Sequence, residues 1–194
     1  TNAYYTDNNG VLFNKAENTL ITYPAGKIGA FTVPGSVTLI RFGAFDGCSY
    51  LTSVTIPDSV TRIGEYAFYK CSNLSSVTIP DGVTRIGYAA FYLCRNLISV
   101  TIPESVTSID AVAFYGCFLL TDITIPDGVT TIGQAAFRRC FSLTSITIPD
   151  SVTSIGREAF RVCSGLASVI FEGSAPTIGT EVFVGIQASN IVVK

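Results

Sequence analysis

Six cysteines recur at a constant spacing of 23 residues: Cys48, Cys71, Cys94, Cys117, Cys140 and Cys163. Such a column of thiols could form disulfides or hold a series of metal ions. Zinc motifs need ligand pairs about two to four residues apart, which this spacing does not provide. Parallel thiols in register about 4.8 Å apart rarely reach the dihedral angle that a disulfide requires. Since Ala25 and Ile186 occupy the same column at its ends, we predict that the cysteines are small buried side chains.

Carboxylates form a second column at the same spacing: Asp58, Asp81, Glu104, Asp127 and Asp150. A row of hard oxygen ligands could bind Ca²⁺. Each of these residues, however, directly follows a proline, and acidic residues are favoured in such turns for local reasons. We therefore interpret the column as turn chemistry, and the sequence predicts no metal site.

Enzymatic chemistry is not indicated. The chain contains no histidine, which is the commonest general base and a frequent zinc ligand. No serine nucleophile motif is present, so we predict no catalytic residues and no cofactor. The formal net charge of −2 argues against a nucleic-acid partner. No apolar run approaches the roughly 18 residues that could cross a bilayer, so no membrane insertion is expected within this segment.

The columns belong to an internal repeat that covers most of the chain. A phenylalanine column has the same 23-residue period: Phe45, Phe68, Phe91, Phe114, Phe137, Phe160 and Phe183. A fixed period of this length indicates a solenoid, in which each unit packs only on its neighbours. The chain contains no methionine, so we expect it to be a mature fragment or an excised domain.

Each unit begins at a proline and ends in a strand, as the stretch from Pro57 to Ile79 illustrates. The Pro-Asp-Ser start predicts a turn. Ala67, Phe68 and Cys71 lie at positions i, i+1 and i+4, which predicts a short helical or 3₁₀ turn on one face. The segment 77–79 alternates apolar, polar and apolar side chains, as a strand of a parallel sheet on the opposite face would. The predicted fold class is therefore an α/β repeat solenoid.

Three regions are expected. Residues 1–33 form an N-terminal cap, in which 11–13 and 20–23 pair as a β-hairpin and Ile28 takes the place of the core leucine of later units. Residues 34–171 contain six units of 23 residues. Residues 172–194 form a degenerate last unit, which lacks the proline and cysteine but keeps Phe183 and ends in a strand over 190–193.

The repeat resembles the BspA-type leucine-rich repeats of bacterial surface proteins over about residues 28–194. The resemblance rests on the segments I-P-[DE]-[SG]-V-T-x-I-G and A-F-x-x-C-x-x-L, and the hairpin GVLFNKAENTLITYPAGK resembles the N-terminal cap of that family. It implies a right-handed superhelix and a secreted or cell-surface location. It also implies protein partners such as host matrix or cell-surface proteins.

Positions that vary between units are the candidates for binding, because core packing does not dictate them. Tyr and Arg, which are enriched at interface hot spots, gather beside the predicted helical turn. The alternative is an ordinary amphipathic surface. The candidates are Tyr66, Tyr69, Tyr92, Tyr115, Arg138, Arg139 and Arg161.

A second candidate surface is the outward face of the strands, where hydroxyl side chains recur at Thr78, Thr101 and Thr124. Extended solenoid faces of this kind bind proteins or glycans. The alternative is that threonine occurs there only because it has a high β propensity. The predicted function is a non-enzymatic protein-binding or adhesion module. A structural spacer and a carbohydrate- or cell-wall-binding module are the alternatives.

Overall fold

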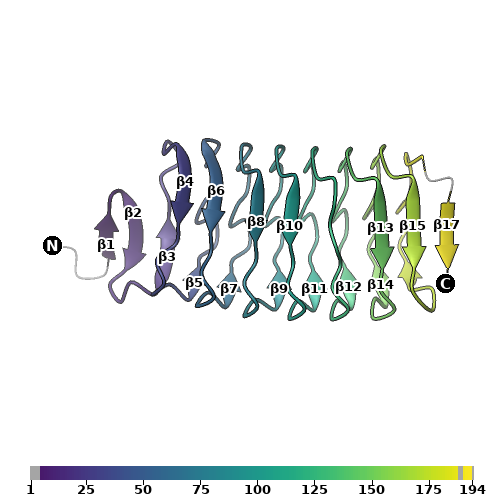
Figure 1. The fold of residues 1–194 in the computed structure, drawn as a ribbon, viewed down its shortest axis with the longest axis horizontal. Helices are drawn as coiled ribbons and strands as arrows, with labels where there is room; N and C mark the ends of the chain where they lie inside the picture. The colour runs from purple at the N-terminus through teal and green to yellow at the C-terminus, as the bar shows by residue number, and fades with distance from the viewer. Residues whose placement is uncertain (1–4, 188–189, 194) are drawn as a thin grey trace.

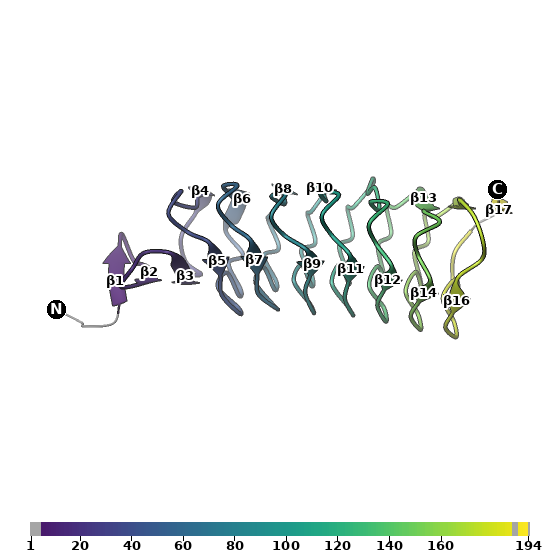
Figure 2. The ribbon, with the colours of Figure 1, turned by 90° about the horizontal axis from the view of Figure 1, so that it is seen from below.

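The computed structural model describes residues 5–187 and 190–193. The chain winds into an elongated solenoid with its ends far apart (Figures 1 and 2). We call one turn of the solenoid a rung. The strands are β1 (Tyr5–Asn8), β2 (Val11–Asn14), β3 (Thr19–Thr22), β4 (Gly29–Thr32), β5 (Leu39–Ile40), β6 (Leu51–Thr55), β7 (Arg62–Ile63), β8 (Ser76–Thr78), β9 (Arg85–Ile86), β10 (Ser99–Thr101), β11 (Ser108–Ile109), β12 (Thr131–Ile132), β13 (Ser145–Ile148), β14 (Ser154–Ile155), β15 (Ser168–Phe171), β16 (Thr177–Ile178) and β17 (Asn190–Val193).

The N-terminal region contains the expected hairpin. Strands β2 and β3 pair antiparallel, and β1 also pairs antiparallel with β2. Strand β3 then pairs parallel with β5, which joins the hairpin to the first rung. Ile28 does not take the predicted core position and is 81% exposed. The reason is a register shift between Gly29 and Ala30, which pairs Gly29 with Leu51.

Two faces of the solenoid are parallel β-ladders. On the strand face, β4, β6, β8 and β10 form one sheet and β13, β15 and β17 another. On the second face, the short strands β5, β7, β9, β11, β12, β14 and β16 line up behind them (Figure 2). Equivalent residues pair directly, as Thr78 does with Thr101. The periodicity therefore places each sequence column in a straight row along the solenoid.

The third face, which we call the turn face, corrects the sequence prediction. No helix or 3₁₀ turn occurs among the described residues. Instead, Tyr66, Phe68 and Lys70 donate their N–H groups to carbonyls of the next rung at 2.7–2.9 Å. Tyr66 and Lys70 both have φ 57°. A helix requires i→i−4 hydrogen bonds and cannot contain such left-handed residues at every fourth position. The fold is thus a β-solenoid, and α/β was the wrong class.

The core is a stack of phenylalanine rings. From Phe45 to Phe160 the rings of successive rungs are 4.9–5.3 Å apart between centroids, with interplanar angles of 2–11°. All of them are fully buried. At the N-terminal end Tyr23 and Phe31 extend the stack and lie 5.2 and 6.0 Å from Phe45. The residues that follow the hairpin, Tyr23 after β3 and Phe31 in β4, therefore cover the first rung with aromatic surface, as a cap requires.

The predicted domain limits at 33/34 and 171/172 remain predictions. The last predicted strand is present as β17. Residues 1–4 of the predicted cap and residues 188, 189 and 194 of the last unit lie outside the described part of the chain.

Candidate functional site

The cysteine column lies inside the core. All six thiols are free and buried. Each thiol donates a hydrogen bond to a main-chain carbonyl of the preceding rung; Cys94, for example, lies 3.0 Å from the Phe68 oxygen, and Cys163 lies 3.0 Å from the Phe137 oxygen. Burial raises the pKa of Cys94 and Cys117 above the ordinary value of a thiol. The geometry agrees with a packing role, in which a small side chain also satisfies a buried acceptor.

We expect the native protein to resist thiol labelling. Because thiolates are the reactive form and burial raises the thiol pKa, iodoacetamide at pH 8 should label none of the six cysteines in buffer and all six in urea. Intact mass spectrometry checks this result. Rapid labelling of the folded protein would contradict it.

The turn face brings the predicted tyrosines together. Tyr69, Tyr92 and Tyr115 stack in one row with centroids 5.0 and 4.8 Å apart and interplanar angles of 14° and 10°. Tyr66 lies beside this row, 5.5 Å from Tyr69, and also contacts Phe42 and Tyr88 at 5.1 and 5.2 Å. We call these residues the tyrosine surface: Phe42, Tyr66, Tyr69, Tyr88, Tyr92 and Tyr115.

Phe42 was not predicted as a site residue. A signal was present, because Phe42 and Tyr88 occupy the same column two rungs apart. Tyr66 stands one position further along its rung and bridges them. Phe42 is 63% exposed and Tyr88 39% exposed. The pair therefore extends the aromatic area beyond the stacked row.

An open depression of about 320 Å³ lies within the tyrosine surface. Ala89 and Val112 also line it, and they occupy the same column as Tyr66. The small side chains of the later rungs thus leave a hollow beside the large ring. Burial raises the pKa of Tyr66, as does the neighbouring Tyr88 hydroxyl. Burial also raises the pKa of Tyr92. The hydroxyls of both residues are therefore neutral donors at physiological pH.

Arginine side chains end the stacked row. The guanidinium carbons of Arg138 and Arg139 lie 5.7 and 6.0 Å from the centre of the Tyr115 ring. Both are within range of a cation–π contact. The aromatic row therefore continues into arginine side chains.

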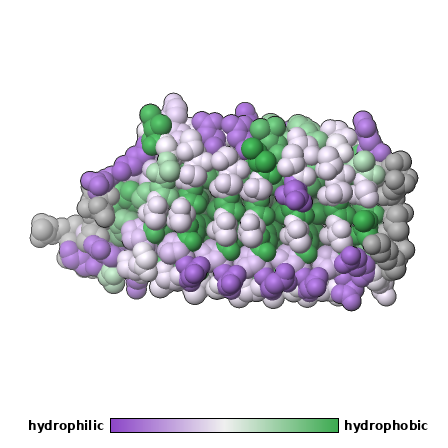
Figure 3. Space-filling view, in the orientation of Figure 1, coloured by the Kyte–Doolittle hydropathy of each residue, from purple (hydrophilic) through white to green (hydrophobic). Residues whose placement is uncertain are grey.

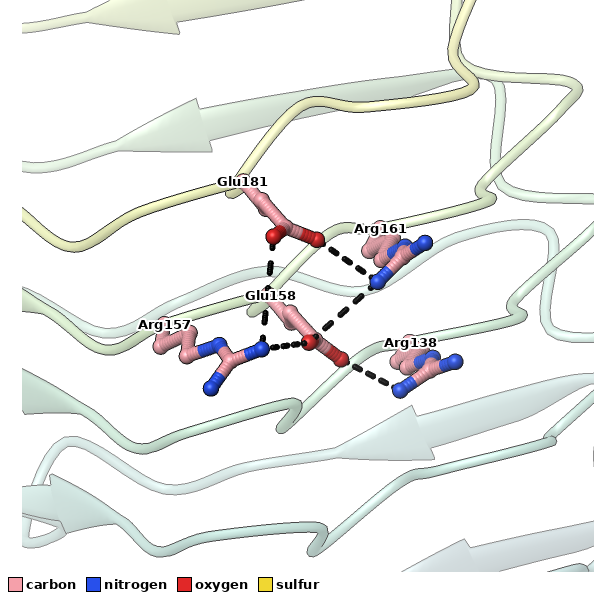
Figure 4. Close-up of polar contacts among 5 residues, drawn as sticks. All are labelled: Arg138, Arg157, Glu158, Arg161 and Glu181. Carbon is pink, nitrogen blue, oxygen red and sulfur yellow. Dashed lines mark hydrogen bonds and ion pairs between the residues drawn. The ribbon is translucent and has the colours of Figure 1, made fainter.

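The positive charge of the arginines at the end of the tyrosine row is largely neutralised by glutamates (Figure 4). Glu158, which is 6% exposed, pairs with Arg138 and lies 3.0 Å from Arg157 and 3.3 Å from Arg161. Glu181 accepts a second contact from Arg161 at 2.6 Å. Of the three arginines predicted for binding, only Arg139 forms no ion pair among the described residues.

The predicted threonines lie on a different face. Thr78, Thr101 and Thr124 are exposed on the strand face, where pale polar residues alternate with green apolar atoms in Figure 3. A depression of about 380 Å³ there is lined by hydroxyl side chains of β6 and β8 and by apolar residues such as Val54 and Val77. The sheet is interrupted at Thr124, since this rung keeps only an isolated bridge between Ser99 and Asp122. The threonines and the tyrosines therefore form separate surfaces.

The described residues contain neither a metal-binding cluster nor a membrane-spanning helix. No group of three or more Cys, Asp or Glu side chains is placed to hold a metal ion there. No helix long and apolar enough to cross a bilayer occurs in that part of the chain.

Comparison with known proteins comes from sequence and from structure. The sequence profile of the BspA-type leucine-rich repeat region matches residues 22–141 and 130–194. No curated protein sequence matches the chain significantly. The similarity thus covers nearly all of the solenoid.

Several solved structures share the fold. A leucine-rich cell surface protein of Faecalibacterium prausnitzii A2-165 is 35% identical with a TM-score of 0.85, over 100% of this chain and 55% of that one. A leucine-rich repeat protein of Bacteroides ovatus is 30% identical with a TM-score of 0.78, over 99% and 52%. One from T. pallidum is 31% identical with a TM-score of 0.79, over 95% and 88%. The chain spans about half the length of the first two.

Proposed function

Because the chain belongs to the BspA-type leucine-rich repeat family, we propose that it is a non-enzymatic module that binds a partner protein through its tyrosine surface. The observation that carries the proposal is the gathering of five tyrosine rings around one open depression, with the exposed ring of Phe42 beside Tyr66. Aromatic residues supply a large share of binding energy at protein interfaces. Stacked rings have little rotamer freedom left to lose on binding.

The proposed binding residues fall into two roles. Tyr66, Tyr69, Tyr92 and Tyr115 provide the contact area. Arg139, which is exposed, contacts the partner directly. Arg138 and Arg161 support the site, because their ion pairs with Glu158 fix the guanidinium group that lies over Tyr115.

The proposed location is the outside of a bacterial cell, either anchored or secreted. The printed description of the Faecalibacterium protein as a cell surface protein supports this proposal. The partners proposed from the family resemblance are host matrix proteins or proteins on neighbouring cells. Adhesion is then the biological role of the module.

A photo-crosslinking experiment tests the proposal. Benzoylphenylalanine is introduced at Tyr88 on the turn face, at Thr101 on the strand face or at Arg62 on the second face. Each variant is incubated with purified collagen, laminin and fibronectin and irradiated. We expect a covalent adduct from position 88 only, because the tyrosine surface makes the contact. An adduct from position 101 alone, or from none of the three, contradicts the proposal.

Carbohydrate binding through the strand face is the second candidate. The depression among the hydroxyl side chains of β6 and β8 favours it, since hydroxyl groups can donate to and accept from sugar hydroxyls. A glycan array distinguishes the two candidates. Glycan binding that is lost in Thr78→Val and kept in Tyr88→Ser would place the ligand on the strand face.

A further inference from the structure

We propose that the tyrosine surface recognises an extended acidic segment of its partner, in which a carboxylate and a large apolar side chain lie two positions apart. The inference rests on the proposed protein-binding function and specifies the chemistry of the partner. It is carried by three observations on the turn face: the covered ring faces, the unpaired cations and a second depression.

The faces of the stacked rings are already covered. Tyr92 has a ring on each side, at 5.0 and 4.8 Å. The ammonium group of Lys70 lies 4.9 Å from the centre of Tyr69, and the guanidinium groups of Arg138 and Arg139 lie near Tyr115. The row therefore presents ring edges and hydroxyl groups. Ring edges carry partial positive charge, so this row attracts carboxylate and carbonyl oxygens and offers no free face for a sugar.

Three cations on this side have no acidic partner in the part of the chain that the structure describes. Lys70, Arg95 and Arg139 are exposed, and none forms an ion pair with another described residue. Each lies against an aromatic ring, at 4.9 Å for Lys70 on Tyr69 and 5.7 Å for Arg95 on Phe118. Arg138, Arg157 and Arg161, in contrast, are all paired with glutamate. The unpaired cations are therefore available to an external anion.

Two depressions lie side by side along these rungs. The first contains Tyr69 and Tyr92. The second, of about 200 Å³, contains the next residues of the same rungs, Lys70 and Leu93, together with Arg95. One depression is thus aromatic and the other is cationic. In an extended peptide, residues i and i+2 point to the same side about 7 Å apart. We therefore assign an apolar side chain of the partner to the aromatic depression and an acidic side chain two positions away to the cationic depression.

The position of the acidic column favours this orientation, although the exposed Asp46 and Glu65 lie in the columns of Tyr69 and Tyr88. The exposed acidic column, with Asp81 and Glu104, follows the strands of the strand face, whereas Lys70 and Arg95 precede them. In Figure 3 purple hydrophilic residues line the lower edge, where the strands end. Because like charges repel an incoming partner and opposite charges steer it, an acidic segment is directed away from that edge and toward the cationic depression.

Fluorescence polarisation with defined peptides tests the inference. The probe is a fluorescein-labelled peptide of repeating Glu-Ser-Phe-Ser, and the comparison peptides repeat Lys-Ser-Phe-Ser and Glu-Ser-Ser-Ser. We expect only the first to bind, with an affinity that falls as salt rises. Lys70→Glu combined with Arg95→Glu should weaken it about tenfold or more, since each reversal turns an attraction into a repulsion. Tyr88→Ser should weaken it as well.

The matched control is Arg62→Glu, which reverses an exposed cation on the second face and should leave binding unchanged. Circular dichroism melting establishes that each variant is folded. Equal binding of the lysine peptide, no binding of the glutamate peptide, or unchanged binding by the double variant overturns the inference. The photo-crosslink at position 88 is read separately: if it persists, the protein-binding function stands while the acidic specificity fails.

Discussion

Phe114→Ala is expected to lower the free energy of unfolding by about 3–5 kcal/mol, the usual cost of removing a buried ring. The Phe114 side chain is fully buried and stacks at 5.3 Å on both Phe91 and Phe137. No side chain beside it can fill the space, because every neighbouring rung repeats the same packed column. A loss of this size is comparable to the whole stability of a small domain.

The position of Phe114 in the middle of the chain increases the effect. In a solenoid, stability is a sum of unit and nearest-neighbour terms, so a cavity in a central rung weakens two interfaces at once. Phe183→Ala is the matched variant near the C-terminal end. Phe183 is only partly buried; it stacks on Phe160 at 5.7 Å and meets Phe171 edge-on at 6.4 Å. Its loss should cost less.

Urea denaturation followed by circular dichroism measures both variants. We expect a much lower midpoint for Phe114→Ala than for Phe183→Ala. We also expect a broadened transition if the two halves of the solenoid unfold separately. Leu119→Ala, at an exposed position on the flank, should leave the midpoint nearly unchanged. Equal costs at positions 114 and 183 would contradict the nearest-neighbour explanation.

The period and the core columns could be predicted from the sequence, because a 23-residue repeat in register makes equivalent residues neighbours. The helical turn could not be predicted correctly. Ala67, Phe68 and Cys71 have helix-like spacing, yet the same spacing results from consecutive tight turns that bury every fourth side chain. What separates the two is the direction of the intervening N–H groups, which reach the next rung from Tyr66 and Lys70. That choice depends on a neighbouring rung and is not visible within one unit.

The candidate site could likewise be predicted only where its contacts lie within one sequence column. The stacked row of Tyr69, Tyr92 and Tyr115 follows directly from one column. The pairing of Arg138 with Glu158 does not, because these residues are 20 positions apart and belong to different columns. Phe42 was missed because it meets Tyr66 across columns. Contacts within a column thus follow from the period, whereas contacts between columns depend on where each rung turns.

The second large effect is expected for Glu158→Ala. Its side chain is 8% exposed, and its carboxylate contacts Arg138, Arg157 and Arg161. Removal of one partner from a buried ion pair usually costs about 3–5 kcal/mol, because the remaining charges lose their compensation. We expect the lower end of that range, since the Arg157 side chain is 56% exposed and can turn to water. Arg161 keeps its contact with Glu181 at 2.6 Å. Arg138, whose side chain is 26% exposed, has no other acidic partner among the described residues, so it carries most of the penalty.

Glu158→Gln separates charge from shape, because glutamine keeps the size and one acceptor oxygen. If the charge is what stabilises this end, Glu158→Gln should lose most of the stability that Glu158→Ala loses in urea denaturation. Glu181→Ala is the exposed comparison: its side chain is 42% exposed, and pairs of that kind contribute about 0–1 kcal/mol. Equal effects at 158 and 181 would contradict the buried-network explanation. Because Arg138 also lies over Tyr115, loss of Glu158 should loosen the end of the tyrosine row as well, and weaker binding of the acidic peptide in the folded Glu158→Gln variant would measure that connection.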